Sequence, residues 1–359
     1  MVKERALLVI VQTAEKSGPF LRESYEEMKE LTLSAGGEVA SATEVKLDRP
    51  SPSHFIREGK IDEIREKVIR EKAQLIIFNV DLTPVQARNL EGAVGVRAVD
   101  RTGLILDIFA RRARSREGKL QVEVAQLNYL LPRLVGQGTI LSRLGGGIGT
   151  RGPGEQKLEV DRRRLRDRIS RLKGELDKLG RHRELIRSGR KRKDFSTVAI
   201  VGYTNAGKST LLNTLTGAGA FTEDKLFATL DPMTRHAKRN GHRILFTDTV
   251  GFLRDLPHGL IEAFKSTLEE VTDADCLIHV LDASSPYAEE QKTAVEKVLE
   301  ELRAGKKPLL LALNKSDLIT AEEREFLTGK YPEGIFISAR EGTGLDRFYE
   351  KLEEILKEG

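Results

Sequence analysis

The stretch Gly202-Tyr203-Thr204-Asn205-Ala206-Gly207-Lys208-Ser209 decides the fold of this chain. It matches the pattern G-x-x-x-x-G-K-[ST], a loop whose backbone N–H groups surround the phosphates of a nucleotide. An apolar, strand-like run covers residues 197–201 before it, and residues 209–216 after it have the composition of a helix. Strand, loop and helix in this order are the setting that such a loop requires. The stretch therefore predicts a P-loop in an α/β domain rather than a chance glycine-rich turn.

Two side chains of the loop and one later segment fit a nucleotide that carries a magnesium ion. Lys208 is expected to reach the β- and γ-phosphates, and Ser209 is expected to bind Mg²⁺. Residues 243–247 form another strand-like run, which ends in Asp248-Thr249-Val250-Gly251. An aspartate at this position can hold Mg²⁺ through water, and the Gly251 N–H can donate to the γ-phosphate.

Two further strand-like runs indicate which base is bound. Residues 309–313 lead into Asn314-Lys315-Ser316-Asp317, and residues 335–337 lead into Ser338-Ala339-Arg340. A carboxylate such as that of Asp317 can accept two N–H donors from one edge of a base. Guanine offers that pair of donors and adenine does not, and the Ala339 N–H could bond the guanine oxygen. The pattern therefore favours GTP over ATP.

The segment Phe227-Ala228-Thr229-Leu230-Asp231-Pro232 lies between the P-loop and Asp248. A threonine in this place can sense the γ-phosphate and Mg²⁺, although a lone loop threonine can also be simply solvated. Asn240-Gly241 between two strand-like runs predicts a type I′ hairpin. It would join the strand after this segment to the strand that ends at Asp248.

Taken in order, these motifs resemble the signature motifs of the Ras-like GTPase superfamily. We predict an α/β fold whose sheet is mixed but mostly parallel, with helices on both faces. The expected catalytic residues are Lys208, Thr229 and Gly251, and the expected metal ligands are Ser209, Thr229 and Asp248. The residues expected to bind the nucleotide are Gly202, Tyr203, Thr204, Asn205, Ala206, Gly207, Lys208, Ser209, Thr210, Phe227, Ala228, Thr229, Asp248, Thr249, Val250, Gly251, Asn314, Lys315, Asp317, Ser338, Ala339 and Arg340.

Phe252 departs from the pattern of many GTPases, which place a glutamine after the Asp-x-x-Gly motif to orient the attacking water. A phenylalanine cannot hydrogen-bond water, so we expect slow intrinsic hydrolysis that a partner or a cation assists. Asn205 matches a pattern seen in GTPases that place K⁺ near the phosphates. The alternative is that Asn205 only tolerates a turn conformation.

Composition and charge bound the protein class. Of the 359 residues, 39% are hydrophobic, which is enough for ordinary cores, and the single cysteine excludes an intrachain disulfide. No signal peptide or membrane-length apolar run is visible, so we expect a cytoplasmic protein. We also expect a monomer. The net charge of +5 hides an asymmetry. Residues 111–193 contain 24 Lys+Arg and 9 Asp+Glu, a net of +15, which leaves −10 for the remainder. Such a block favours a polyanion partner over a merely solvated helix face.

The basic block has the pattern of a helical hairpin. Apolar residues recur at heptad-like spacing in two runs, and each run predicts a helix with one apolar face. The runs are Leu120, Val124, Leu127, Leu131 and Leu134, and then Leu158, Leu165, Ile169, Leu172, Leu176 and Leu179. Between them, residues 136–154 contain eight glycines. The G-x-G-x-x-G at 147–152 is not a dinucleotide motif, because no strand precedes it. This loop is expected to bind phosphate through Arg143 and Arg151, and the alternative is a flexible connector without a ligand.

Alternation of type organises the N-terminal region. Strand-like runs at 6–12, 75–79 and 96–100 alternate with helical patterns at 22–34, 61–72, 84–92 and 104–114. This order predicts a parallel sheet with crossover helices. We therefore divide the chain into an N-terminal α/β domain (1–115), a basic hairpin (116–190) and a G domain (195–359).

Several long stretches resemble motifs of the HflX GTPases, and the resemblance covers nearly the full chain. They are Leu82 to Glu91, Val99 to Ala110, Ala125 to Leu134, Gly145 to Lys157, and the P-loop, Phe227 to Pro232 and Asp248 to Phe252 segments. Arg57 and Met233 stand where the family often has Gly and Thr, which puts only local details in doubt. The resemblance implies GTP and GDP binding with Mg²⁺, and it implies the large ribosomal subunit and its rRNA as partner. It further implies that the factor separates stalled or idle ribosomes.

Two other functions stay open at this point. One is a GTP-gated protein that binds a non-ribosomal RNA. Co-sedimentation with ribosomes would distinguish it from a factor that binds the large ribosomal subunit. The other is a metabolic ATPase or kinase with an incidental basic helix. The pair Asn314 and Asp317 argues against the latter, because it favours guanine. No second P-loop pattern is visible in the N-terminal region, so ATP hydrolysis there is not expected.

Overall fold

The computed structural model describes residues 3–13, 18–134, 153–191, 195–217, 226–227, 229–239, 242–254, 257, 259–260 and 264–358. The chain divides into two compact units. Residues 1–111 and 119–177 form the N-terminal unit, and residues 112–118 and 178–359 form the C-terminal unit. Across the described ranges, no helix combines the length and apolar character that crossing a membrane requires. The three-part division of the sequence remains a prediction beside this division into two.

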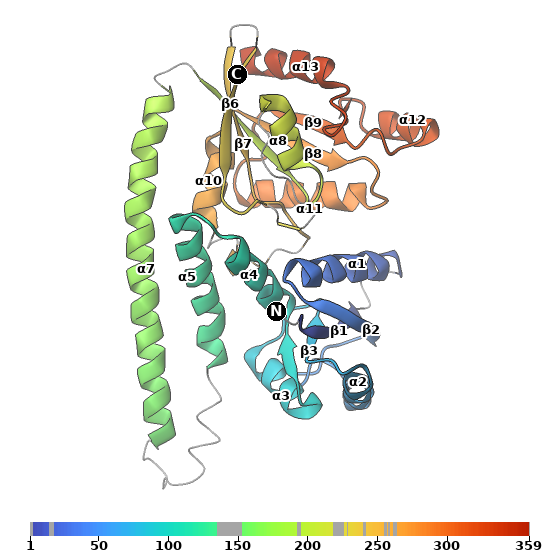
Figure 1. Ribbon diagram of the computed structural model, residues 1–359, viewed down its shortest axis with the longest axis vertical. Helices are drawn as coiled ribbons and strands as arrows, with labels where there is room; N and C mark the ends of the chain where they lie inside the picture. Colours follow the sequence, from blue (N-terminus) through green and yellow to red (C-terminus); the bar gives the residue numbers. More distant parts are fainter. Residues whose placement is uncertain are drawn as a thin grey trace. The chain divides into compact units, whose positions relative to one another are not determined.

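The N-terminal unit is built on a four-stranded sheet in the order β2-β1-β3-β4, and every neighbouring pair is parallel. Its strands alternate with helices along the chain, as the sequence predicts (Figure 1). The two central strands are buried because both carry nearly continuous apolar runs. The elements are β1 Arg5–Thr13, α1 Gly18–Ser34, β2 Glu38–Leu47, α2 Glu58–Glu71, β3 Leu75–Phe78, α3 Pro84–Val94, β4 Arg97–Val99 and α4 Arg101–Arg112.

Strand β2 has no counterpart among the strands that the sequence predicts. It is an edge strand of mixed polarity, and only three of its ten residues are buried. Helix α3 shows why the other elements could be predicted from the sequence. Thr83 and Gln86 form a reciprocal capping box at its start, Pro84 follows directly, and Gly95 ends it at φ 83°. Those signals are local, whereas β2 is defined by its pairing with β1.

Helices α5 (Arg116–Arg133) and α7 (Pro153–Lys191) form the expected antiparallel hairpin and run side by side in Figure 1. Arg168 of α7 donates to Glu123 of α5 at 2.9 Å. Of the predicted apolar positions, Val124, Ile169 and Leu172 are buried. Residues 135–152, with Arg143, Arg151 and nearly all of the glycine-rich loop, lie outside the described residues.

The C-terminal unit contains a six-stranded sheet in the order β10-β9-β8-β5-β7-β6. All neighbouring strands are parallel except β6 and β7, which pair antiparallel with Arg239 opposite His242. The predicted turn between them, residues 240–241, lies outside the described residues. The elements are β5 Ser196–Gly202, α8 Lys208–Thr216, β6 Met233–Arg239, β7 His242–Asp248, α10 Lys265–Asp273, β8 Cys276–Asp282, α11 Ala288–Glu301, β9 Leu309–Asn314, α12 Ala321–Lys330, β10 Ile335–Phe336 and α13 Leu345–Glu358.

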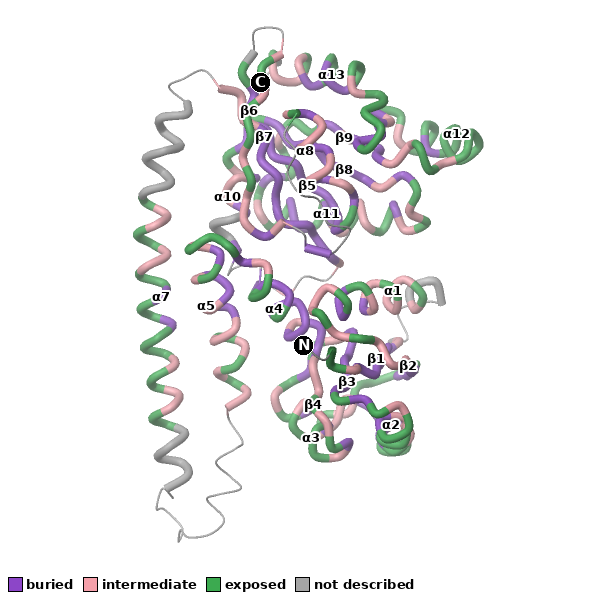
Figure 2. The backbone as a smooth tube through the Cα atoms, in the orientation of Figure 1, coloured by how far each residue is buried: buried purple, intermediate pink, exposed green. Residues whose placement is uncertain are grey.

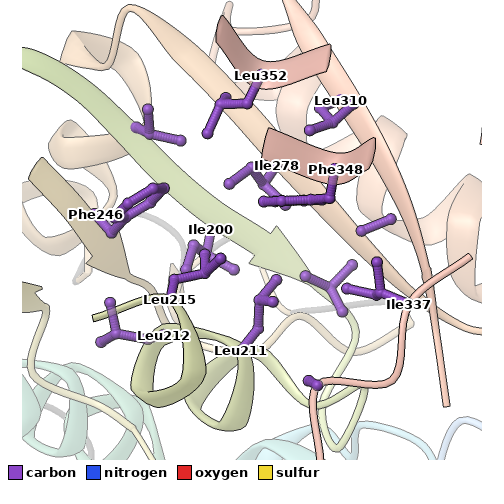
Figure 3. Close-up of a cluster of buried hydrophobic side chains, with 14 of the residues drawn as sticks. Ile200, Leu211, Leu212, Leu215, Phe246, Ile278, Leu310, Ile337, Phe348 and Leu352 are labelled. Carbon is purple, nitrogen blue, oxygen red and sulfur yellow. The ribbon is translucent and has the colours of Figure 1, made fainter. Parts of the chain in front are cut away.

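Helices cover both faces of this sheet, which confirms the predicted fold class. On one face, leucines of α8 meet Phe348 and Leu352 of α13 over strand residues such as Ile200 and Ile278 (Figure 3). Leu281 alternates with the strand residues of that cluster, so it lies on the opposite face, where it packs with residues of α11 and α12. Figure 2 shows the central strands mostly buried. The two apolar layers hold the strands rigidly, and the strand ends carry the site.

Candidate functional site

The predicted motifs converge because their strands are parallel. Strands β7, β5, β8, β9 and β10 all point the same way, so their carboxyl ends meet at one edge of the sheet. Ligands of open α/β sheets bind at this edge. The P-loop follows β5, Asp248 ends β7, Asn314 ends β9, and Ser338 follows β10. The fold thus assembles residues that lie more than 130 positions apart in the chain.

The P-loop has backbone angles that its glycines permit. Gly207 lies at φ 95° directly before α8, and a Cβ on Gly202 would collide with the carbonyl of Val280. Asn205 is exposed at φ 63°, a left-handed conformation that asparagine tolerates. In the part of the chain that the structure describes, no side chain caps the start of α8, so its first N–H groups are available to an anion.

The side chain of Lys208 folds back over the P-loop. Its Nζ donates to the carbonyl oxygen of Tyr203 at 2.7 Å, and the residue is buried. Burial lowers the pKa of Lys208 to about 8, although the carboxylate of Asp248 opposes this effect. Burial also raises the pKa of Asp248, against the attraction of Lys208. Both groups lack the hydration that their charged forms need, so an anion and a cation arriving together would stabilise them.

The three predicted metal ligands are in mutual contact. Ser209 Oγ donates to Asp248 Oδ2 at 2.6 Å, Thr229 Oγ1 donates to the same oxygen at 2.8 Å, and the two hydroxyl oxygens lie 2.9 Å apart. Among the described residues, the other carboxylate oxygen, Asp248 Oδ1, is buried without a hydrogen-bond partner. Within the described ranges no cluster of three or more His, Cys, Asp or Glu could hold a metal. Two hydroxyls and one carboxylate, whose Oδ1 has no partner among the described residues, fit Mg²⁺, which completes its shell with water and phosphate.

The segment after Asp248 pairs with the P-loop. Phe252 donates its N–H to Gly202 O at 3.1 Å and accepts from Thr204 N at 2.8 Å. This pairing brings Gly251 against the loop, where a Cβ would lie 3.0 Å from Lys208 Nζ and 2.8 Å from Thr204 Cγ2. Glycine is therefore needed at position 251 for the segment to approach.

Asn314 links two loops on the base side. Its Nδ2 donates to Ala206 O at 2.8 Å, and its Oδ1 accepts from Ala339 N at 2.9 Å. The Ala339 N–H that the sequence assigns to guanine is thus engaged within the protein here. Lys315 pairs with Asp282 at 2.7 Å, a contact that sequence reasoning missed. Its only signal is that Asp282 ends strand β8.

The remaining expected residues differ in how directly they face the site. Asp317 and Arg340 are exposed. Thr249 donates its hydroxyl to Ile200 O at 2.7 Å, so this side chain joins β7 to β5. Val250 and Phe227 are buried, Thr210 is half-buried, and the Ser338 hydroxyl accepts from Glu341 N at 3.1 Å. Ala228 lies outside the described residues.

These features define a P-loop GTPase domain. Hydroxyl and carboxylate side chains lie beside the P-loop, and the motif Asn-Lys-x-Asp begins at the end of strand β9 of the same sheet. Proteins named GTPase HflX match almost all of the chain. One from Caldanaerobacter subterraneus subsp. tengcongensis is 53% identical, covering 99% of this chain and 82% of that protein. One from Escherichia coli is 45% identical, covering 98% and 83%. The chain belongs to the HflX family of GTPases, and its reaction is the hydrolysis of GTP.

Family models and a solved structure agree with this assignment. Residues 22–110 match the model GTP-binding GTPase N-terminal, residues 112–190 match GTP-binding GTPase Middle Region, and residues 197–315 match 50S ribosome-binding GTPase. The crystal structure of SsGBP in complex with GDP resembles this chain with a TM-score of 0.54 at 26% identity, covering 99% of both chains. The resemblance of the whole chain to the HflX GTPases, read from its motifs, is thereby confirmed.

Proposed function

We propose that this GTPase binds the large ribosomal subunit through rRNA and separates stalled or idle ribosomes. Hydrolysis of GTP would then release it in the cytoplasm. The observation that carries the proposal is the outer face of α7. Arg163, Arg171 and Lys173 are exposed there, while Ile169 and Leu172 are buried on the inner face. The match of the G domain to a model described as 50S ribosome-binding GTPase supports the same partner.

At the nucleotide site we propose that Ser209, Thr229 and Asp248 hold Mg²⁺, which neutralises charge that develops on the phosphates. Lys208 and the Gly251 N–H would stabilise the γ-phosphate, because both lie where the segment after Asp248 meets the P-loop. Asp317 would read the guanine edge. Loss of the γ-phosphate would free Thr229 and Gly251 and so change the conformation.

A potassium ion beside Asn205 is a further proposal for the same site. The exposure of this residue and its φ of 63° agree with a coordinating loop and equally with a simple turn. Rates of GTP hydrolysis in K⁺ and in Na⁺ separate the two. Equal rates would mean that Asn205 only accommodates the turn and does not bind K⁺.

The partner is tested by co-sedimentation of the full chain with purified large subunits, in GDP and in a non-hydrolysable GTP analogue. We expect binding that tightens with the analogue and weakens with salt, because phosphate contacts release counterions. The triple variant Arg163→Glu/Arg171→Glu/Lys173→Glu should reduce the slope of log K against log salt by about 2 to 3, on the basis of roughly 0.7 to 0.9 per lost contact.

A matched control uses three exposed lysines of the G domain. The variant Lys297→Glu/Lys306→Glu/Lys357→Glu reverses as many charges without touching α7. It should keep the wild-type salt slope. Equal losses in both variants would indicate an unspecific charge effect. Binding that does not distinguish GDP from the analogue would contradict the switch, and tighter binding to a small structured RNA than to the subunit would favour the non-ribosomal alternative.

A further inference from the structure

Asp231 makes contacts outside the nucleotide motifs. It follows Thr229 by two residues, and its Oδ2 accepts the backbone N–H of Arg114 at 2.9 Å and of Ser115 at 2.8 Å. The Ser115 hydroxyl donates to the other oxygen, Oδ1. Residues 112–118 belong to the same compact unit as the G domain, although they precede it by about 80 positions. A single carboxylate therefore binds three donors of a remote segment.

This segment leads directly into helix α5, which begins at Arg116. Ser115 Oγ also accepts from Gly118 N at 2.8 Å, which caps the first turn. A Cβ on Gly118 would collide with the Asp231 carboxylate, so the helix start and the carboxylate are in close contact. The N-terminus of a helix carries partial positive charge, which a nearby carboxylate stabilises. Asp231 accepts the N–H groups of the two residues before α5 and places its negative charge beside the helix start.

The position of Asp231 restricts that of Thr229. Two residues of extended chain span at most about 7 Å, so anchoring one end limits where the other can lie. Leu230 between them is buried, and Pro232 after Asp231 restricts the backbone of Asp231 itself. At the other end of this two-residue span, Thr229 Oγ1 lies 2.8 Å from Asp248 Oδ2 and 2.9 Å from Ser209 Oγ.

We propose that Asp231 is a positioning residue for GTP hydrolysis. The two residues directly before α5, Arg114 and Ser115, hold Asp231, and Asp231 in turn holds Thr229 beside Ser209 and Asp248. The proposal rests on the role given above to Thr229 as a ligand of magnesium and sensor of the γ-phosphate. Coupling of this kind is reciprocal: displacement of the start of α5 lowers occupancy of the Thr229 position, and GTP bound at Thr229 stabilises the start of α5. Since α5 is the first helix of the basic hairpin, a partner on the hairpin has a direct route to the γ-phosphate sensor.

The test uses two variants that leave every nucleotide motif and Asp231 intact. Gly118→Ala places a methyl group against the carboxylate, and alanine is otherwise a better helix former than glycine. Ser115→Ala removes the hydroxyl that donates to Asp231. Steady-state GTP hydrolysis of the full chain is measured against Mg²⁺ concentration, together with affinity for a fluorescent GDP. Both variants should lower kcat by about five- to tenfold, the lower range of coupling between sites. They should also raise the Mg²⁺ requirement in GTP and change GDP affinity less than twofold.

Thr83→Ala is the matched control, because it removes an N-cap hydroxyl of similar value at α3, within the N-terminal unit. It should leave kcat and the Mg²⁺ requirement unchanged. The double variant Ser115→Ala/Asp231→Ala should have the same kcat as Asp231→Ala alone, because the Ser115 hydroxyl has no carboxylate to donate to once Asp231 is removed. Wild-type kcat in Gly118→Ala and Ser115→Ala, with Thr229→Ala impaired, would overturn this inference alone. An unimpaired Thr229→Ala would overturn the proposed role of Thr229 and the inference with it.

Discussion

Asn314→Ala should destabilise the protein even when no nucleotide is present. Asn314 is buried, and its amide joins the P-loop carbonyl of Ala206 to the N–H of Ala339 through bonds of 2.8 and 2.9 Å. Truncation would leave a buried acceptor and a buried donor without partners. Each such group costs about 1–3 kcal/mol, so we expect a loss of about 2–4 kcal/mol after some relaxation. For a domain of this size, 3 kcal/mol corresponds to a drop of roughly 6–12 °C in Tm.

The assay compares thermal unfolding of nucleotide-free wild type, Asn314→Ala and Asn314→Asp, followed by calorimetry with GDP. Asn314→Asp keeps an oxygen for the Ala339 N–H, but it places a buried carboxylate against the Ala206 carbonyl oxygen, so its Tm should be no higher than that of Asn314→Ala. A Tm of Asn314→Ala equal to that of the wild type would refute the reasoning. Asn314 would then act on the base alone, and only the affinity for GDP would fall.

Three other outcomes are expected. Because burial lowers the pKa of Lys208 to about 8 and phosphate favours its charged form, GTP affinity should fall by up to about tenfold per pH unit above pH 8; constant affinity from pH 7 to 9 in calorimetry would contradict this. Burial, with a smaller effect of Lys292, lowers the pKa of His279 to about 3, so the unfolded chain binds the proton first and stability should be lost as pH falls from 6.5 towards 3. His279→Leu should reduce that slope in chemical denaturation and raise stability at neutral pH by about 1–3 kcal/mol, because both ring nitrogens are buried without partners among the described residues. Tyr129→Phe removes the 2.7 Å bond to the buried Asp100 and should cost about 1–3 kcal/mol in thermal unfolding while GTP hydrolysis stays at the wild-type rate.

The sequence was sufficient wherever the signal is local. The P-loop follows a buried strand and precedes a helix, and the structure has β5 and α8 at those places. The parallel order of the strands then explains why motifs distant in sequence meet at one edge of the sheet. The contact of Ser209, Thr229 and Asp248 follows from that geometry, although the local sequence does not give its distances.

Contacts between remote segments could not be predicted in the same way. Strand β2 is half-polar and takes its form from pairing with β1. Asp282 ends a buried strand like many aspartates, and only the fold brings it to Lys315. Asp231 stands within a predicted motif, yet its donors lie about 115 positions earlier in the chain. In each case the partner, rather than the residue type, determines the role.

Phe252 shows how such a contact bears on catalysis. Its backbone pairs with Gly202 and Thr204, and its side chain is 1% exposed. Replacing the ring by a glutamine would bury an amide without assured partners, at a cost of about 1–3 kcal/mol, before any water could be oriented. The position therefore serves to pack the segment after Asp248 against the P-loop. The group that orients water must come from elsewhere, and this is the physical basis for expecting slow hydrolysis that a bound partner or cation accelerates.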